Sequence, residues 1–389
     1  MSTTNISPAP TRSIRVGLGV SVLERAMQTD GHLDGIGMYT SELVKYLPTA
    51  NIAPQRFAFQ GRSGLNAGPN VQIMPGSVTV NLLRSAAFGM SFPSPPGFEQ
   101  QLDLFHAPDH LVPRFRNIPV LASVMDPIPL MHPEWTRVKY QALKNWVLRR
   151  TVQSADHFVT ISQFVIDDIA THFRIPRERI SAVELGVDDA YFETMPEEER
   201  QGHLATLGLP PAFLLFIGTL QPRKNVLRLI QAFEQLPVDI QRACPLVVAG
   251  REGWSSEPDR AALARLTEKK TGRWLNYVTP RQKMALLQSA RALVFPSLYE
   301  GFGLPVLEAF ASGLPVVASN TTSIPEVAGD AALLVDPLNV EQLTHAMRRI
   351  VEDEALHAAL TVAGRARAAQ FTWSRTAERT AALYQRILA

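Results

Sequence analysis

Residues 292–319 read ALVFPSLYEGFGLPVLEAFASGLPVVAS, and this stretch decides the fold of the chain. It opens and closes with short apolar runs, residues 292–295 and 315–318, which have the length of strands buried on both faces. Pro305 suits the first turn of an intervening helix, and Gly313 suits a left-handed cap at its end. The stretch therefore predicts a βαβ unit.

The loop between the first strand and the helix, residues 297–303, has features of an anion-binding site. It leaves the carboxyl end of the strand and enters the amino terminus of the helix, where unpaired backbone N–H groups point outward. Gly301 and Gly303 let those N–H groups approach a ligand closely. The loop is therefore predicted to bind a phosphate.

Two carboxylates bracket the predicted phosphate site, Glu300 in the loop and Glu308 in the helix, with seven residues between them. Glu308 stands among apolar residues, so it is expected to be half-buried and to need hydrogen-bonding partners, which the ribose of a nucleotide would supply. The alternative is a carboxylate that only complements the helix dipole. Glu300, directly before Gly301 in the loop, is expected to contact hydroxyls or cations of a ligand.

The pair Glu300 and Glu308, with IPEVAG at residues 324–329 and FTW at 371–373, resembles the donor-site signature of retaining GT-B glycosyltransferases of family 4. The resemblance implies an α/β fold of two doubly wound Rossmann-like domains facing across a cleft. It also implies that Glu300 contacts the donor sugar and Glu308 the ribose. Further donor-binding positions implied by the resemblance are Gly301, Phe302, Gly303 and Leu304.

Residues 216–225, FIGTLQPRKN, are similar to the phosphate-clamp segment of the same family. The similarity implies donor contacts for Gly218 and Thr219 and catalytic roles for Arg223 and Lys224. A basic pair at the start of a helix opposes the helix dipole, so it indicates a nearby anion. Both side chains are expected beside the cleft and outside the core.

Composition and length fit an ordinary globular protein of about two domains, since 46% of the 389 residues are hydrophobic and 19% are charged. A net charge of +2 gives no general attraction to nucleic acid. The single cysteine, Cys244, excludes an internal disulfide framework. No apolar run reaches the roughly 18 residues of a membrane span, so a cytoplasmic protein is expected.

Four segments are predicted along the chain. Residues 1–13 are expected to be disordered, 14–200 to form an acceptor-side domain, 201–372 to bind the nucleotide sugar, and 373–389 to form a helix that returns to the first domain. The polar segment EEERQGHLATLGLPP, at residues 197–211, is the candidate linker. A long loop, residues 21–34, precedes Gly35 and Gly37, which resemble the glycine-rich loop facing the donor diphosphate; a plain turn is the alternative.

Two segments of the first half carry open alternatives. Met125 stands where many relatives have histidine, and the adjacent Asp126 is either a sugar or acceptor contact or a cap for the turn before Pro127. Residues 135–150 combine five basic residues with an apolar stripe at helical spacing. An ordinary core-facing helix is the favoured interpretation, and peripheral contact with the anionic inner face of the plasma membrane is the alternative.

The sequence thus predicts a retaining hexosyltransferase that uses a nucleoside-diphosphate sugar, with a GDP-mannose-type donor favoured, and a saccharide or lipid-linked acceptor in polysaccharide or O-antigen synthesis. No DxD sequence occurs, so a metal-independent reaction is expected, with no cofactor. The alternatives are a GT-B epimerase or phosphorylase and a non-catalytic sugar-nucleotide-binding relative. A dinucleotide-dependent oxidoreductase is disfavoured because no GxGxxG follows the first strand.

Overall fold

The computed structural model describes residues 14–28, 33–60, 68–135, 139–253 and 257–389. Within them the chain forms two parallel sheets. The first has seven strands in the order β3-β2-β1-β4-β5-β6-β7, and the second has six in the order β10-β9-β8-β11-β12-β13. In each sheet the strand order reverses direction once, next to the first strand of the sheet. The predicted α/β fold with two doubly wound sheets is confirmed.

The strands of both sheets are short and mostly buried. In the first sheet they are β1 Val16–Gly19, β2 Gln55–Phe59, β3 Val71–Met74, β4 Leu104–Ala107, β5 Val120–Ser123, β6 His157–Thr160 and β7 Ile180–Ala182. In the second sheet they are β8 Leu214–Ile217, β9 Leu246–Ala249, β10 Gly272–Leu275, β11 Ala292–Phe295, β12 Val316–Ser319 and β13 Leu333–Val335. The central strands β8, β9, β11 and β12 are buried along their whole length, as apolar runs covered on both faces should be.

The βαβ unit predicted from residues 292–319 is present. Strands β11 and β12 pair in parallel, with Val294 opposite Val317, and α13, Leu304–Ala311, lies between them in the chain. Pro305 occupies the first turn of α13. Gly313 has φ of 75° and donates its N–H to the carbonyl of Phe310, which closes the carboxyl end of the helix.

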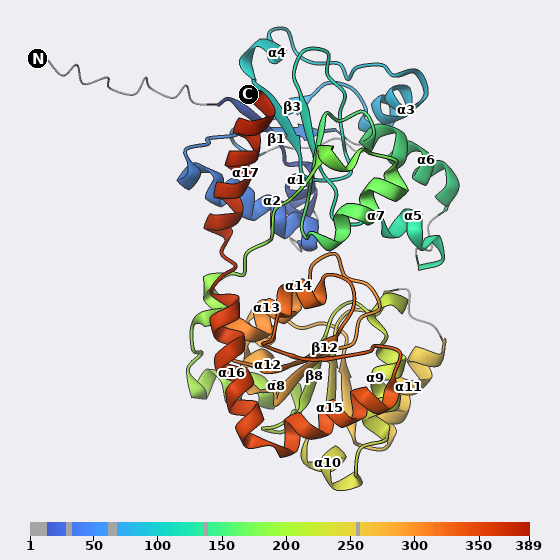
Figure 1. The fold of residues 1–389 in the computed structure, drawn as a ribbon, viewed down its shortest axis with the longest axis vertical. Helices are drawn as coiled ribbons and strands as arrows, with labels where there is room; N and C mark the ends of the chain where they lie inside the picture. The colour runs from blue at the N-terminus through green and yellow to red at the C-terminus, as the bar shows by residue number, and fades with distance from the viewer. Residues whose placement is uncertain (1–13, 29–32, 61–67, 136–138, 254–256) are drawn as a thin grey trace, which may run out of the picture. The chain divides into compact units, whose positions relative to one another are not determined.

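Helices connect the strands of both sheets. They are α1 Ser21–Met27, α2 Gly35–Tyr46, α3 Val78–Phe88, α4 Phe98–Gln101, α5 Ile128–Met131, α6 Gln141–Val152, α7 Phe164–Phe173, α8 Glu197–Leu207, α9 Val226–Glu234, α10 Val238–Ala243, α11 Glu257–Glu268, α12 Pro280–Ser289, α13, α14 Ile324–Ala328, α15 Val340–Glu352, α16 Glu354–Ala368 and α17 Trp373–Leu388. Beside the second sheet, α9 packs against α15 and α13 against α16 (Figure 1).

The chain divides into two compact units. Unit 1 comprises the described residues up to Val124, together with Val147–Val159 and Ala377–Ala389; unit 2 comprises Met125–Trp146 and Thr160–Thr376. Helix α17 therefore supplies residues to both units. The domain boundaries stated from the sequence stay a prediction.

The core of unit 1 contains a chain of buried polar side chains. His106 on β4 is fully buried, with Nδ1 at 2.7 Å from the hydroxyl of Tyr384 on α17 and Nε2 at 2.7 Å from the hydroxyl of Ser123 on β5. Tyr39 on α2 reaches the same Ser123 hydroxyl at 3.1 Å. Burial lowers the pKa of His106 to about 3, so its imidazole is neutral. The network joins α2 and α17 to the sheet.

Two segments form helices that the sequence analysis missed. The expected long loop at residues 21–34 contains α1, although residues 29–32 lie outside the described part. The candidate linker forms α8, which packs against α12 and buries Leu204. Its signals were present: Pro196 precedes it, acidic residues fill its first turn, and Gly208 follows it with φ of 62°.

The predicted apolar stripe in residues 135–150 does not lie on one helix. Trp135 ends a 3-10 turn and stacks on His132 at 3.7 Å, whereas α6 begins at Gln141 and residues 136–138 are not described. Tyr140, Leu143 and Trp146 are exposed by 80%, 52% and 44%. The predicted stripe comprised Trp135, Val138, Ala142 and Trp146. Ala142 and Trp146 are exposed, so the favoured core-facing interpretation is wrong for these two side chains, while Trp135 is half-buried and Val138 lies outside the described residues.

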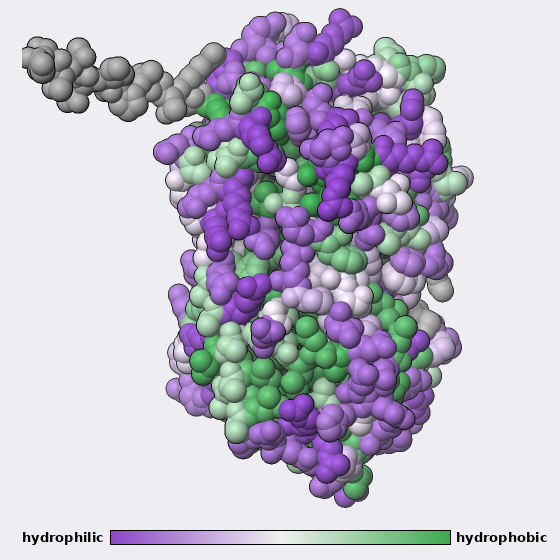
Figure 2. All heavy atoms as spheres, in the orientation of Figure 1, coloured by the Kyte–Doolittle hydropathy of each residue, from purple (hydrophilic) through white to green (hydrophobic). Residues whose placement is uncertain are grey.

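Hydrophilic side chains predominate on the face shown in Figure 2, and the hydrophobic groups gather mainly in the lower half of that view. Among the residues that the structure describes, no helix combines the length and the apolar character needed to span a membrane.

Candidate functional site

The candidate site lies at the point where the strand order of the second sheet reverses, between β8 and β11. Open parallel sheets bind ligands at such a point, outside the carboxyl ends of the strands. β8 leads into the 3-10 turn Pro222–Lys224, which carries Arg223 and Lys224, and β11 leads into the loop that carries Glu300. The basic pair was expected in the first turn of α9; instead Asn225, with φ of 60°, separates that turn from the helix.

Main-chain and amide contacts tie the two loops together. The side-chain amide of Asn225, which is 5% exposed, donates to the carbonyls of Pro296 at 3.0 Å and Pro337 at 2.7 Å. The N–H of Leu298 donates to the carbonyl of Arg223 at 2.7 Å. The relative positions of the basic pair and Glu300 are therefore fixed by the backbone as well as by charge.

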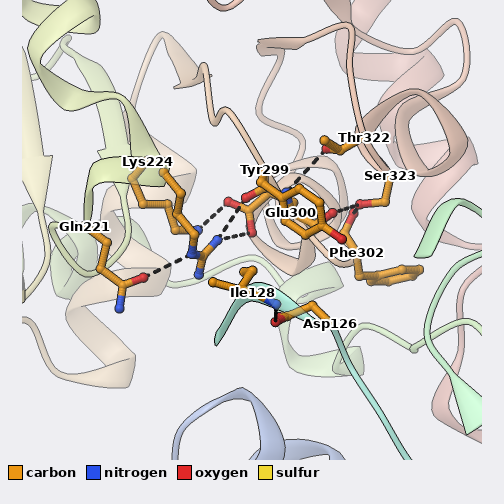
Figure 3. Close-up of polar contacts among 10 residues, drawn as sticks. Asp126, Ile128, Gln221, Lys224, Tyr299, Glu300, Phe302, Thr322 and Ser323 are labelled. Atoms are coloured by element: carbon orange, nitrogen blue, oxygen red, sulfur yellow. Dashed lines mark hydrogen bonds and ion pairs between the residues drawn. The ribbon is translucent and has the colours of Figure 1, made fainter. Parts of the chain in front are cut away.

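Arg223, Lys224 and Glu300 form one ion cluster (Figure 3). Lys224 Nζ lies 2.6 Å from Glu300 Oε1, and Arg223 Nη1 lies 2.8 Å from Glu300 Oε2. Arg223 also donates to the carbonyl of Tyr299 at 3.1 Å. The ammonium group of Lys224 lies 4.6 Å above the ring of Phe295, which adds a cation–π contact. The cluster carries one net positive charge.

Two members of the ion cluster, Lys224 and Glu300, are buried, which corrects for Lys224 the expectation that both basic side chains lie outside the core, whereas Arg223 is half-buried. Lys224 and Glu300 are each 6% exposed, because the lysine side chain passes inward over β11. Burial would raise the pKa of Glu300, but the charges of Arg223 and Lys224 outweigh it and hold that pKa at about 2. Burial lowers the pKa of Lys224, against the opposing effect of Glu300.

The loop at residues 297–303 leads into the amino terminus of α13. Gly303 is the residue before the helix and has φ of 115°; a Cβ there would lie 2.8 Å from Ile324 Cδ1, so glycine is required. Phe302 is 3% exposed and packs its ring against Phe371, so only its backbone is available to a ligand. Leu304 begins the helix and is half-buried.

Gly218 and Thr219 follow β8 at the same edge of the sheet. The N–H of Gly218 is already bonded to the carbonyl of Ala249 at 2.9 Å. A Cβ on Gly218 would lie 3.5 Å from Lys224 Cε, so the lysine side chain packs directly over this residue. Thr219 is exposed, and its side chain is available to a ligand.

Glu308 has partners within the chain that the sequence did not indicate. Lys283 on α12 places its ammonium group 2.6 Å from the Glu308 carboxylate and 5.5 Å from the ring centroid of Tyr191. Tyr191 hydrogen-bonds the same carboxylate; its burial, together with the negative charge of Glu308, raises the pKa of Tyr191. Glu308 is therefore a half-buried, charge-paired group and not only a complement to the helix dipole.

Asp126 lies beside the ion cluster, where its negative charge contributes to raising the pKa of Arg223 (Figure 3), whereas Gly35 and Gly37 do not belong to the same unit. Asp126, in unit 2, accepts the N–H of Ile128 on Oδ1 at 3.0 Å, which confirms the turn-capping interpretation for that oxygen. Gly35 and Gly37 belong to unit 1, where Gly35 begins α2 and the N–H of Gly37 donates to Asp34 Oδ1 at 2.8 Å. Their predicted contact with the donor stays a prediction.

The sequence analysis also missed two residues that hold the Glu300 loop, Thr322 and Ser323. Thr322 Oγ1 accepts the N–H of Glu300 at 3.3 Å, and Ser323 Oγ donates to the carbonyls of Glu300 and Phe302, both at 2.8 Å (Figure 3). Their place directly before IPEVAG was the available signal. In the described ranges, no three His, Cys, Asp or Glu residues gather in a way that could hold a metal ion.

Two family models match the chain. Residues 204–367 match the model of glycosyl transferases group 1, and residues 33–191 match the model of glycosyltransferase family 4. The O-antigen chain mannosyltransferase B of Escherichia coli is 32% identical over 379 residues, which cover 91% of this chain and 96% of that protein.

Solved structures of other proteins share the fold. The sucrose-phosphate synthase of Thermosynechococcus elongatus superposes with a TM-score of 0.68 at 18% identity, covering 96% of this chain and 99% of that one. The Anabaena protein HepE, solved with UDP and glucose, gives a TM-score of 0.70 at 16% identity, covering 96% and 100%. Together with the two sheets, these matches give a GT-B fold.

Proposed function

The chain belongs to glycosyltransferase family 4, and we propose that it transfers a hexose from a nucleoside-diphosphate sugar to a saccharide or lipid-linked acceptor with retention of configuration. The observation that carries this proposal is the ion cluster at the switch point of the second sheet, in which buried Lys224 and Glu300 pair beside the half-buried Arg223. A cationic cluster at that edge suits a diphosphate, and the carboxylate within it suits the hydroxyls of the attached sugar.

In the proposed reaction the bond between the sugar C1 and the diphosphate oxygen breaks, and its electron pair stays on that oxygen. The acceptor hydroxyl oxygen forms the new bond to C1, and its proton passes to the departing diphosphate. Negative charge therefore grows on the diphosphate in the transition state. Arg223 and Lys224, already fixed by Glu300, need no reorganisation to stabilise that charge.

Glu300 can serve both the cations and the sugar. Each of its carboxylate oxygens accepts one hydrogen bond within the cluster, and a carboxylate has about four acceptor positions in all. We assign the remaining positions to hydroxyls of the donor sugar. Glu308, held by Lys283, is assigned to the ribose, whose diol can donate to it.

We further propose that the reaction is metal-independent, because Arg223 and Lys224 supply the positive charge that a divalent cation would otherwise provide at the diphosphate. We propose a mannosyl donor of the GDP-mannose type; the E. coli relative, an O-antigen chain mannosyltransferase, supports the mannosyl group. Retention is supported by the family resemblance alone.

Contact with an anionic membrane is part of the proposal, as suits a lipid-linked acceptor. Tyr140, Leu143 and Trp146 are exposed apolar side chains at a spacing of three residues, and the exposed Lys144 and Arg150 lie beside them on α6. An apolar stripe flanked by cations suits an interface rich in acidic lipid. Leu143→Asp should reduce cosedimentation with phosphatidylglycerol vesicles; unchanged cosedimentation would contradict this surface.

The experiment that tests the function is a panel of nucleoside-diphosphate sugars and acceptors. A bound nucleotide at about 100 times its Kd should add roughly 2.7 kcal/mol to stability, so thermal shift identifies the base. Release of nucleoside diphosphate only when an acceptor is present supports transfer. Conversion of the donor without an acceptor would instead indicate an epimerase, and NMR of the product linkage tests retention.

A further inference from the structure

Thr322 adopts a backbone conformation that its side chain disfavours. Its φ is 61°, in the left-handed region. Seven non-glycine residues in the described part of the chain have positive φ, and Thr322 is the β-branched one among them. A β-branched residue crowds its own backbone in this region, and such strain persists where surrounding structure enforces it, often at functional sites.

The surroundings that enforce this conformation are the two ends of a short connection. β12 ends at Ser319, which is fully buried, and α14 begins at Ile324, which is also fully buried. Ser323, between Thr322 and α14, is fully buried and donates its hydroxyl to two carbonyls of the neighbouring loop. Buried residues on both sides of Thr322 therefore hold its backbone in place.

The strained conformation places the Thr322 hydroxyl against the main chain of Glu300. The N–H of Glu300 donates to Thr322 Oγ1 at 3.3 Å, while the carbonyl of Glu300 accepts from Ser323 Oγ at 2.8 Å (Figure 3). Both backbone groups of Glu300 are thus held by two consecutive residues. The side chain of the same residue forms the centre of the ion cluster with Arg223 and Lys224.

We propose that Thr322 is a positioning residue for the transfer reaction, whose hydroxyl fixes the Glu300 backbone and so keeps the carboxylate aligned between the two cations and the donor sugar. The inference rests on the proposed function of the Glu300 cluster. This role explains why a threonine occupies the position. Glycine would adopt the same backbone conformation without strain, but it has no hydroxyl to hold Glu300.

Three substitutions at Thr322 separate positioning from structural support. Thr322→Gly relieves the strain and removes the hydroxyl, so we expect an unfolding temperature equal to or above that of the parent and a kcat about tenfold lower, with the donor KM changed less than kcat. Thr322→Val removes only the hydroxyl and should lower kcat to a similar extent. Thr322→Ser keeps the hydroxyl and should retain most of the activity.

Lys270→Gly provides the matched control. Lys270 also has positive φ, 56°, but it is exposed and lies between α11 and β10. This variant should keep the parental kcat and, like Thr322→Gly, should not lower the unfolding temperature. Three results would overturn the proposal. They are a Thr322→Gly protein in which kcat and the unfolding temperature fall together, a Thr322→Val protein with the parental kcat, and a Thr322→Ser protein whose kcat is as low as that of Thr322→Val.

Amide hydrogen exchange at Glu300 tests the contact without any assay of transfer. On the full chain, the exchange rate measured at this single N–H should be higher in Thr322→Val than in the parent. In Thr322→Ser it should equal the parental rate. Parental exchange in Thr322→Val would overturn the contact. If the parent transfers sugar from no donor in the panel, the proposed function fails, and the exchange measurement still decides whether Thr322 holds Glu300.

Discussion

Replacing Lys224 by methionine removes one cation from the ion cluster and keeps a flexible apolar side chain of similar length. The variant leaves Glu300 with Arg223 as its remaining charged partner in the cluster, at a position that is 6% exposed. The structure therefore predicts two losses, one of stability and one of turnover, whereas a side chain outside the core would have affected turnover alone.

The loss of stability can be estimated from the Glu300 carboxyl group. Its pKa is about 2 in the folded protein, against 4.5 for a free glutamate, which corresponds to about 3 kcal/mol of net favourable interaction with the charged form. Arg223 keeps part of that interaction, so we expect Lys224→Met to cost about 2 kcal/mol. The transition-state charge on the diphosphate should make the loss in kcat about 10² to 10³-fold.

Urea unfolding at pH 7 measures the first loss, and acceptor-dependent release of nucleoside diphosphate measures the second. The double variant Lys224→Met, Glu300→Gln also removes the buried negative charge, so it should regain most of the lost stability while kcat stays low. The surface offers a matched cluster, in which Lys269 and Arg265 pair with Glu234 at 3.0 and 3.5 Å. Lys269→Met should cost less than about 1 kcal/mol and leave kcat unchanged.

Two results would refute the reasoning on Lys224. A Lys224→Met protein with parental kcat would show that the ammonium group does not stabilise the departing diphosphate. A double variant no more stable than Lys224→Met would show that the cost does not arise from the charge left on Glu300.

Three further predictions follow from the site and the core. Chelation with EDTA should leave the transfer rate unchanged; a loss that Mn²⁺ or Mg²⁺ restores would contradict the metal-independent reaction. Glu308→Ala should weaken calorimetric binding of the free nucleoside diphosphate and Glu300→Ala should not, because only the former loses the ribose contact; equal binding by both variants would remove the ribose assignment. Burial lowers the pKa of His106 from 6.5 to about 3. Between these two pH values the unfolded chain binds a proton at this residue and the folded chain does not. Acidification therefore lowers the free energy of unfolding, by about 1.4 kcal/mol at about pH 5.5. His106→Asn should flatten the dependence of urea stability on pH between about 7.5 and 5.5, and a slope equal to the parental one would show that His106 is not its source.

Buried strands and the βαβ unit could be predicted because their signals are local. A run such as ALVF must be covered on both faces, and Pro305 and Gly313 mark the ends of α13 within eight residues of each other. Helix α8 was missed for a different reason. α8 is polar enough to be taken for a linker, although its flanking Pro196 and Gly208 carry the helix signals.

The ion cluster could be predicted only in part. Arg223 and Glu300 are separated in sequence, but they follow strands that lie next to each other once the sheet order is known. The sequence indicated both residues and assigned them to different parts of the donor. It could not show that they pair, because that depends on how far each loop extends beyond its strand.

The sequence did not indicate the contact of Lys283 with Glu308 or the backbone conformation of Thr322, although Thr322 lies just before the IPEVAG segment. Lys283 is one of many basic residues on helices, and its contact with Glu308 depends on how α12 packs against α13. The backbone of Thr322 is one that threonine rarely adopts, so residue preferences favour a different conformation. Both positions depend on tertiary structure, which overrides local preference.

Helix α17 has a consequence for the synthesis of the chain on the ribosome. Tyr384, which completes the buried polar network of unit 1, is translated only after the whole of unit 2. At 5 to 20 residues per second, roughly 200 residues separate these two parts of unit 1 by on the order of 10 to 40 s. During that interval the nascent unit 1 lacks the Tyr384 hydroxyl that meets His106 Nδ1, so every residue of unit 2 is available for folding before unit 1 is complete.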